Sequence, residues 1–433
     1  MKIMEPFDMY TLAEKLWPIN RSITGRGVRE TLKIIRNSGL SSLSISEIPT
    51  GTKVLDWTIP QEWEVKRAFI KKPDGSIFCD YSQNNLHLVG YSIPIHQKMT
   101  LTELNNFLYS LPDQPDAIPY VTSYYEPKWG FCLTQNERDL LKEGEYEVFI
   151  ESRHFDGFLT FGELIIKGET TSEILLSTYI CHPSMANNEI SGPVVTTAVS
   201  LWLDSLPSRR FTYRILFIPE TIGSIAYLSQ HLEYLQSHVV AGFNITCIGD
   251  ERTYSYLPSR NGRTLSDRIA LHVLKWTDPN YIAYTWDHRG SDERQYCAPG
   301  IDLPIASIMR SKYGEYPEYH TSLDQLGTVV TAQGLQGGFE IIKKAIQAIE
   351  VDFTTKMKVL GEPQLGNRGL YPNTSIKGGH KDDLKILMNL ITWSDGKHTL
   401  LEIAEKINVP IWDLTPYVQA LKDSNLLETF IEN

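Results

Sequence analysis

Residues 177 to 195 read STYICHPSMANNEISGPVV, and this stretch joins a buried strand to a helix. The run that leads into it, EILLSTYI at 173 to 180, is apolar along its length, which is typical of a strand inside a parallel sheet. The Ser-Gly-Pro near its end is typical of a helix start. His182 and Asn188 lie between these elements, just past the end of the strand. Ligands of parallel α/β sheets bind outside the carboxyl ends of strands, so this stretch predicts a fold and a site together.

The same pattern recurs along the chain. Further strands are predicted for FTYRILFI (211 to 218), VAGFNITCIG (240 to 249) and LPIASIM (303 to 309). Helical patterns are found near 193 to 206, 223 to 235, 264 to 277 and 332 to 351. Apolar strands that alternate with helices predict an α/β domain with a mixed, mostly parallel sheet flanked by helices.

Two regions differ from this pattern before the last strand. Residues 8 to 38 are predicted to form helix, loop and helix, with NRSITGRG as the loop, and residues 56 to 150 hold short β-rich runs separated by turns. We assign 1–55 and 151–355 to the α/β domain and 56–150 to an inserted β-rich domain. Aromatic side chains of the insert are expected to line a cleft or a subunit contact: Tyr120, Tyr124, Tyr125 and Trp129.

The last region, placed at 370–433, reads as three short amphipathic helices after a loop rich in Gly, Pro and Asn. This is the pattern of a winged-helix domain. Its third helix carries Asp413 and Asp423 against Lys422, so it lacks the basic stripe of a DNA reader. We therefore favour a protein contact for this domain over a nucleic-acid contact.

Composition bounds the class of protein. The 433 residues carry a net charge of -11, with 42% hydrophobic and 21% charged residues, which is typical of a soluble protein of two or three domains. The negative charge disfavours nucleic acid and anionic membranes as partners. Five cysteines, an odd number without a CxxC pair, argue against a disulfide framework, and no apolar run has the length of a membrane span. We expect a cytoplasmic protein without a membrane partner.

Polar residues that suit a metal follow several of the predicted strands. His182, Glu220, Asp250 and His320 each lie just past a strand end or on a loop at the same edge. Two histidines and a glutamate satisfy a catalytic zinc ion with one position open for water. A lone histidine after a strand is as often a hydrogen-bonded structural residue, so the ordered set carries this interpretation.

Five segments in order carry a resemblance: STYICHPSMANNEISGPVV, IPETIGSIAYL, GFNITCIG, SDERQYCAPGIDLP and EYHTSLDQL. They resemble, over roughly residues 150 to 350, the zinc-dependent aminopeptidase and carboxypeptidase superfamily that includes bacterial leucyl aminopeptidase and glutamate carboxypeptidase. PETIGS and GSDERQYCAPG, with the insert and the winged helix, look more narrowly like a bacterial family described as having an aminopeptidase-like domain.

The resemblance implies His182 and His320 as the first and last histidine ligands. It also exposes departures from the pattern. Asn188 stands where an aspartate bridges two zinc ions, Thr246 stands where an aspartate ligand is usual, and Glu220 is the single carboxylate in place of a Glu-Glu pair. A pair of divalent ions needs more negative charge than this. We expect at most one tightly held zinc ion, on His182, Glu220 and His320, with Asn188 at the metal-binding edge.

The sequence does not decide which residue is the general base that would activate water. If Glu220 ligates the metal, Glu189, Asp292 and Glu293 are candidates on loops at the same edge, and otherwise Glu220 itself is the base. Each also has a structural alternative: Asn188 and Glu189 would cap the helix near 191, and the charges of GSDERQ would form surface ion pairs.

These observations predict an aminopeptidase-like metallohydrolase that acts on a small peptide or an amide-linked amino compound. The rival is a non-catalytic ligand-binding or scaffold protein that retains the peptidase fold, because Asn188 and Thr246 remove two acidic ligands. The sequence does not decide whether the chain forms a homo-oligomer.

Overall fold

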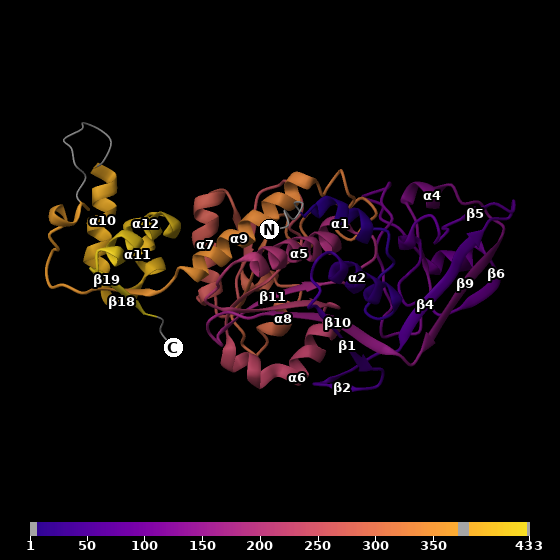
Figure 1. Ribbon diagram of the computed structural model, residues 1–433. Helices are drawn as coiled ribbons and strands as arrows, with labels where there is room; N and C mark the ends of the chain where they lie inside the picture. The colour runs from indigo at the N-terminus through magenta and orange to yellow at the C-terminus, as the bar shows by residue number, and fades with distance from the viewer. Residues whose placement is uncertain (1–6, 371–380, 431–433) are drawn as a thin grey trace. The chain divides into compact units, whose positions relative to one another are not determined.

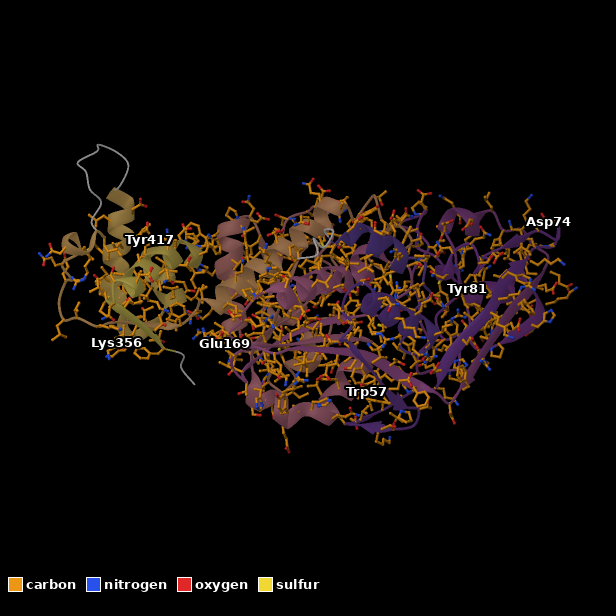
Figure 2. All side chains as sticks on the ribbon, viewed as in Figure 1. Trp57, Asp74, Tyr81, Glu169, Lys356 and Tyr417 are labelled. Atoms are coloured by element: carbon orange, nitrogen blue, oxygen red, sulfur yellow. The ribbon has the colours of Figure 1, made fainter. Side chains whose placement is uncertain are left out.

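A computed structural model describes residues 7–370 and 381–430, which form two compact units (Figures 1 and 2). The first unit comprises Met1–Asp267 and Asn280–Glu340, and the second comprises Arg268–Pro279 and Ile341–Asn433. Within the described residues, no helix is long and apolar enough to cross a membrane. All five cysteines are buried and free.

The first unit is built on an eight-stranded mixed sheet. In sheet order its strands are β1 (Ser44–Pro49), β10 (Phe158–Ile166), β12 (Thr212–Ile218), β11 (Glu173–Tyr179), β13 (Val239–Asn244), β16 (Ile305–Met309), β14 (Ser255–Leu257) and β15 (Ile282–Ala283). The four strands from β12 to β16 run parallel. Every residue of β11 and β12 is buried, as their continuous apolar sequences require. The predicted α/β fold with a mixed, mostly parallel sheet is confirmed.

Helices cover both faces of this sheet (Figure 1). Helices α1 (Met9–Leu16), α2 (Arg26–Asn37) and α5 (Ser191–Ser205) lie on one face, and α6 (Ile222–His238) lies on the other. Helix α5 begins where the chain passes very close to another loop: a Cβ on Gly192 would lie 2.5 Å from the carbonyl oxygen of Ile245. Glycine is therefore required where the quoted stretch enters its helix.

One predicted strand is shorter than expected. Residues 240 to 249 were expected to stay in the sheet, but β13 ends at Asn244 and the chain continues as a buried loop in which Cys247 has a φ of 48°. Burial accounts for the apolar, strand-like composition of this loop, and the Thr246 hydroxyl donates to the Tyr179 hydroxyl there at 2.6 Å.

The inserted region forms a separate antiparallel sheet with the order β5-β4-β9-β6. The strands are β5 (Ile77–Phe78), β4 (Glu62–Lys71), β9 (Glu145–Phe155) and β6 (Ile95–Thr100). A segment of this module also pairs with the α/β core, because Pro119 forms a β-bridge with Thr321. The β-rich insert thus contacts the loop that carries His320.

The second unit has winged-helix architecture. Its helices are α10 (Lys381–Trp393), α11 (Leu400–Ile407) and α12 (Ile411–Asp423), and its antiparallel sheet holds β18 (Asp395–Thr399), β17 (Thr354–Met357) and β19 (Leu427–Phe430) in that order. Thr399 and Glu402 close α11 with a capping box. The predicted start at 370 is too late, because β17 precedes the Gly- and Pro-rich loop and is the central strand of the sheet.

Candidate functional site

Loops at the carboxyl ends of neighbouring strands bring three predicted ligands together. His182 follows β11 and Glu220 follows β12, and His182 Nε2 lies 3.6 Å from Glu220 Oε2. His320 comes from the loop before α9 (Ala332–Glu350), and its ring centre lies 5.6 Å from that of His182. His182 and His320 are 138 residues apart in sequence, so distant segments share one edge of the sheet.

His320 is held with a free ring nitrogen. Its ring stacks on Tyr319 at 3.9 Å and packs edge-on against Tyr120 at 5.1 Å. Its Nε2 is buried and meets no hydrogen-bond partner among the described residues. Burial and the neighbouring His182 lower the pKa of His320 to about 3, so the imidazole is neutral and one ring nitrogen keeps its lone pair. This is the form of histidine that ligates a metal.

His182 is oriented by a buried ion pair. Its Nδ1 lies 3.0 Å from Glu189 Oε2, and Arg21 Nε lies 3.1 Å from Glu189 Oε1. Arg21 also donates to the backbone carbonyl of His182 at 2.9 Å. The guanidinium and Glu189 are almost completely buried. A carboxylate on one imidazole nitrogen is the usual support for a ligand that uses the other nitrogen, so Glu189 positions His182 and leaves Nε2 facing Glu220.

The pKa of His182 is raised in the absence of a metal. Burial opposes the charged imidazolium, but Cys181, Glu189 and Glu220 outweigh it. Burial also raises the pKa of the Cys181 thiol to about 11, so that group is neutral at ordinary pH. The two carboxylates are therefore what stabilises the imidazolium.

The positions expected to lack acidic ligands are filled by neutral hydrogen bonds. Asn188 Nδ2 donates to the Tyr179 hydroxyl at 2.8 Å, and the Thr246 hydroxyl lies 2.6 Å from the same oxygen. Asn188 Oδ1 is buried and unpaired within the described residues. Tyr179 thus fills the space between Asn188 and Thr246 without adding charge.

Asp324 ties the His320 loop to the loop that follows His182. Its carboxylate accepts from the backbone N–H groups of Asn187 and Asn188 at 2.7 and 2.9 Å and from the Tyr316 hydroxyl at 2.9 Å. These asparagines belong to a π-helical turn (Ala186–Ile190), a feature that is frequent at functional sites. Asp250 has a similar structural role, because it accepts from Asn187 Nδ2 at 2.8 Å.

The remaining carboxylates differ in how far they are already satisfied. Glu293 accepts from Asn244, Tyr313 and two backbone N–H groups, so the expectation that it acts as a base is not supported by its contacts. Asp292 uses Oδ1 for Thr221 N and the Ser224 hydroxyl, at 2.7 and 2.8 Å, while its buried Oδ2 is unpaired within the described chain. Burial and then Glu220 raise the pKa of Asp292 to about 7, and burial also raises the pKa of Glu220.

Backbone strain concentrates at these loops. Ser184, Thr221, Cys247 and His320 have positive φ values of 40, 65, 48 and 54°. Positive φ is costly for residues other than glycine and persists where the surroundings enforce it, often at active sites. Thr221 directly follows the candidate ligand Glu220, and His320 is itself a candidate ligand.

The set of His182, Glu220 and His320 fits a metal ion better than the more compact group that surrounds Cys181. Among the described residues, one group of three ligand-type side chains has all its donor atoms within 4.8 Å: Cys181, His182 and Glu189. That group has a neutral thiol, and its carboxylate is already bonded to His182 and paired with Arg21, so a cation there would face a buried guanidinium.

Beside the set of His182, Glu220 and His320, the Arg294 guanidinium donates to the Thr221 hydroxyl at 2.8 Å, and its charge lowers the pKa of Glu220 against the effect of burial. Two imidazoles on one tetrahedral zinc ion would place their ring centres about 5–6 Å apart, and the observed separation is 5.6 Å. The unpaired His320 Nε2 faces no other described donor. These residues therefore fit a single ion.

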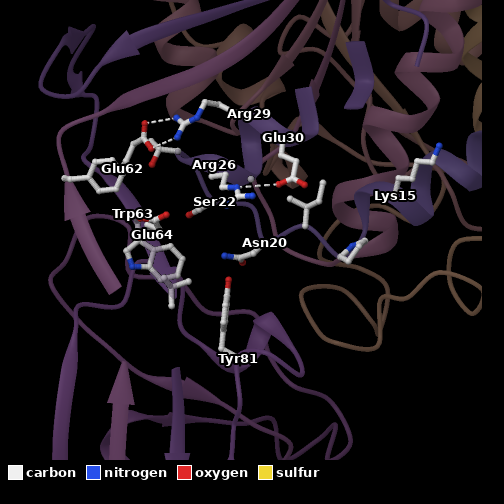
Figure 3. Close-up of a pocket in the computed structure, with 16 residues that line it drawn as sticks. Lys15, Asn20, Ser22, Arg26, Arg29, Glu30, Glu62, Trp63, Glu64 and Tyr81 are labelled. Atoms are coloured by element: carbon white, nitrogen blue, oxygen red, sulfur yellow. Dashed lines mark hydrogen bonds and ion pairs between the residues drawn. The ribbon is translucent and has the colours of Figure 1, made fainter. Parts of the chain in front are cut away.

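A cavity of about 450 Å³ lies elsewhere in the first unit, between the loop before α2 and strand β4 (Figure 3). Four of its charged side chains form two pairs: Arg29 binds Glu62 through both carboxylate oxygens at 2.7 and 2.9 Å, and Arg26 lies 3.9 Å from Glu30. None of the candidate metal ligands lines it. We therefore place the site at the imidazoles and not in this cavity.

Comparison with known proteins assigns the family. A model described as a domain of unknown function (DUF4910) matches residues 10–352, and a winged helix-turn-helix model matches residues 353–429. The chain belongs to the DUF4910 family. A Clostridium acetobutylicum protein, described as a candidate polysaccharide biosynthesis protein with an aminopeptidase-like domain, is 43% identical over 400 residues, which are 92% of this chain and 91% of that one.

Several solved structures are similar in fold to this chain. A candidate peptidase from Clostridium acetobutylicum has a TM-score of 0.91 at 41% identity, covering 98% of this chain and 96% of its own. A zinc aminopeptidase from Bacillus subtilis has a TM-score of 0.55 at 13% identity, over 79% of this chain and 95% of its own. An M28 peptidase precursor from Shewanella amazonensis gives 0.56 at 14%, over 82% and 95%. The aminopeptidase-like fold expected from the sequence is confirmed.

Sequence analysis missed several residues of the site. Arg21 lies in a loop between helices, 168 residues before its partner Glu189, and nothing in NRSITGRG indicates that pairing. Tyr120 was noted only as one aromatic residue of the insert, yet its ring packs on both imidazoles, at 5.4 Å from His182 and 5.1 Å from His320. Both contacts join distant segments and leave no local pattern.

Replacing Arg21 with methionine should destabilise the protein strongly. The change keeps the volume roughly similar but leaves the Glu189 carboxylate buried without its cation, which typically costs about 3–5 kcal/mol. Urea unfolding measures the loss. Arg26→Met is the matched control, because 85% of the Arg26 side chain is exposed, and a change within about 0.5 kcal/mol is expected there. Equal effects of the two substitutions would contradict the assigned role of Arg21.

Replacing Asp292 with asparagine should stabilise the metal-free protein at high pH. The folded pKa of about 7 exceeds the unfolded value of about 3.9, so ionisation of Asp292 opposes folding in full above pH 7 and not at all below about pH 4. Asp292→Asn should therefore be more stable than the wild type at pH 8, by an amount that shrinks at pH 4.5. Asp287→Asn, at a side chain that is 94% exposed, should show no such pH dependence.

Proposed function

We propose that this chain is a metal-dependent, aminopeptidase-like hydrolase with one zinc ion. The observation that carries the proposal is the meeting of His182, Glu220 and His320 at the carboxyl edge of the sheet, with His320 Nε2 buried and unpaired among the described residues. The aminopeptidase-like fold supports the same class of reaction.

His182, Glu220 and His320 would hold the ion, and Asn188 Oδ1 is a further neutral donor at that edge. Zinc in such a site lowers the pKa of bound water and polarises a carbonyl group. The chain itself orients the donors: Glu189 fixes the His182 ring, and Tyr319 and Tyr120 fix the His320 ring.

Asp292 is the carboxyl group that we assign to proton transfer. Its pKa of about 7 lies near the pH at which a base is most effective, and its Oδ2 has no partner among the described residues. Glu189 is occupied by Arg21 and His182, and Glu293 by its four hydrogen bonds. In this scheme Glu220 ligates the metal and Asp292 accepts the proton.

A second ion lacks ligands in this arrangement. Two zinc ions add four positive charges, whereas Asn188, Thr246 and Tyr179 offer only neutral groups bonded to one another. We therefore assign one ion to the site.

The substrate that we propose is a small peptide or an amide-linked amino compound. The Clostridium relative's description joins an aminopeptidase-like domain to polysaccharide biosynthesis. An amide on an amino sugar belongs to the proposed class, and so does a short peptide.

One observation also supports the alternative function, a non-catalytic ligand-binding protein. The hydrogen bonds that join Asn188 and Thr246 to Tyr179 also suit a protein that binds a ligand without turnover. For the winged helix we propose a contact with protein, because α12 carries Asp413 and Asp423 with Lys422 as its one basic residue.

Metal analysis with point variants separates these alternatives. The wild type, purified without chelators, should bind about one equivalent of zinc and hydrolyse members of a peptide and amide panel. His320→Ala and Glu220→Gln should lose the zinc, because each removes a ligand. Asp292→Asn should keep the zinc but lose about 10²–10⁴-fold in turnover, the usual contribution of a general base.

His288→Ala is the matched control, since this exposed histidine lies in the same region outside the ligand set. It should change neither zinc content nor turnover. Zinc far below one equivalent in the wild type, with no thermal stabilisation on adding the ion, would contradict the metal site.

A further inference from the structure

A groove of about 380 Å³ lies in the β-rich insert, and Tyr124 but not Tyr120 lines it. Its walls include Tyr91, Tyr124, Tyr125 and His154. The Tyr124 ring meets Tyr91 edge-on at 5.2 Å and Tyr125 at 6.4 Å, and Tyr91 meets His154 at 5.6 Å. Four aromatic rings in contact with one another thus form part of the groove lining.

Two tyrosines connect this groove to the imidazoles. Tyr120 packs edge-on against His182 and His320, and its hydroxyl lies 2.6 Å from the hydroxyl of Tyr124. Tyr124 also lines the groove. The wall of the groove is thus joined by one hydrogen bond to the ring that contacts both imidazoles.

The polar groups of the groove are largely engaged with the protein. Gln61 Nε2 donates to Asp156 at 3.0 Å, Ser123 Oγ donates to the Gly90 carbonyl at 3.1 Å, and Glu126 forms an ion pair with Lys128. Burial lowers the pKa of His154, so this imidazole is neutral at pH 7. No unbalanced charge in the lining favours an ionic ligand, and ring faces remain as the main contact surface.

The rim and the backbone support a binding role. Tyr125 is 56% exposed and packs edge-on against Trp57, which is 36% exposed, so aromatic surface faces solvent at the mouth of the groove. Tyr91 has a φ of 65°, a costly conformation for a tyrosine, and stacks on Trp63 at 5.7 Å. The protein thus holds one wall of the groove in a conformation that local preference opposes.

We propose that this groove is a subsite for a neutral ring with an apolar face, part of the same substrate whose amide lies at His182 and His320. An aromatic side chain and a pyranose share this chemistry. The inference rests on the proposed hydrolase function, and it makes Tyr124 and Tyr125 determinants of specificity.

Calorimetric titration tests the subsite without requiring turnover. The probes are phenylalaninamide, methyl α-D-glucopyranoside and alaninamide, each titrated into full-length protein with and without zinc. At least one ring probe should bind about tenfold more tightly than alaninamide. Tyr125→Ala, at an exposed position, should weaken that ring probe by about three- to tenfold and leave alaninamide unchanged. Tyr109→Ala, at a tyrosine of the insert that is 37% exposed and outside the groove, is the matched control.

The outcomes separate the two proposals. Tighter binding of phenylalaninamide would identify the ring as an aromatic side chain, and tighter binding of methyl α-D-glucopyranoside would identify it as a pyranose. Either result supports the subsite. Ring discrimination that depends on Tyr125, in a protein without turnover, would sustain the subsite and overturn the hydrolase. Turnover with equal binding of ring probes and alaninamide, or with the same loss in Tyr109→Ala as in Tyr125→Ala, would overturn the subsite alone. Tyr124→Phe adds a second readout: it removes the hydroxyl pair but keeps the ring, so KM for ring-bearing substrates should change less than in Tyr125→Ala.

Discussion

A buried carboxylate between two cations organises this molecule's candidate site. Glu189 pairs with Arg21 on one side and with His182 on the other, at 3.1 and 3.0 Å. Removing either partner would leave an unpaired charge in a buried site, and such charge is costly. The pairing also joins three segments: the loop between α1 and α2, the end of β11 and the π-helical turn before α5. Because Nδ1 of His182 is occupied, Nε2 is the nitrogen left to face Glu220.

Electrostatic balance limits what the rest of the edge can hold. Burial raises the pKa of both Glu220 and Asp292, and Glu220 also lies 3.6 Å from His182 Nε2. Tyr179 links Asn188 to Thr246 where related enzymes are expected to carry aspartates. A single divalent ion would offset the two nearby carboxylates, whereas a second would bring positive charge without a counter-charge. In the proposed site this edge of the sheet therefore carries a charge that suits one divalent ion.

The sequence predicted the fold because buried parallel strands and their helices leave local patterns. EILLSTYI and FTYRILFI gave β11 and β12 almost residue for residue, and the resemblance placed His182, Glu220 and His320 on neighbouring loops. The predictions that were wrong concerned features that depend on contacts between distant parts of the chain. The buried loop after Asn244 looked like a strand, and β17 was missed because it is separated from the helices of its domain by a long loop.

Roles were harder to predict than positions for the same reason. From the sequence, Glu189 and Glu293 were both candidates for the general base. Their partners could not be foreseen, because Arg21 is far from Glu189 in sequence and Tyr313 lies on a different segment of the chain from Glu293. Asp292 differs from Glu293 by one position, and the difference between a free and a satisfied carboxyl oxygen is visible only in three dimensions. A role for Tyr120 of the insert is likewise visible only in the structure, where its ring contacts both imidazoles.

An anomalous-difference map from crystals of zinc-loaded protein, recorded above and below the zinc absorption edge, would locate the metal in the folded chain. We predict one peak, bonded to His182 Nε2, His320 and Glu220, with Glu189 still on His182 Nδ1. Two fully occupied peaks, or a single peak at Cys181 and Glu189, would contradict the one-metal site described above.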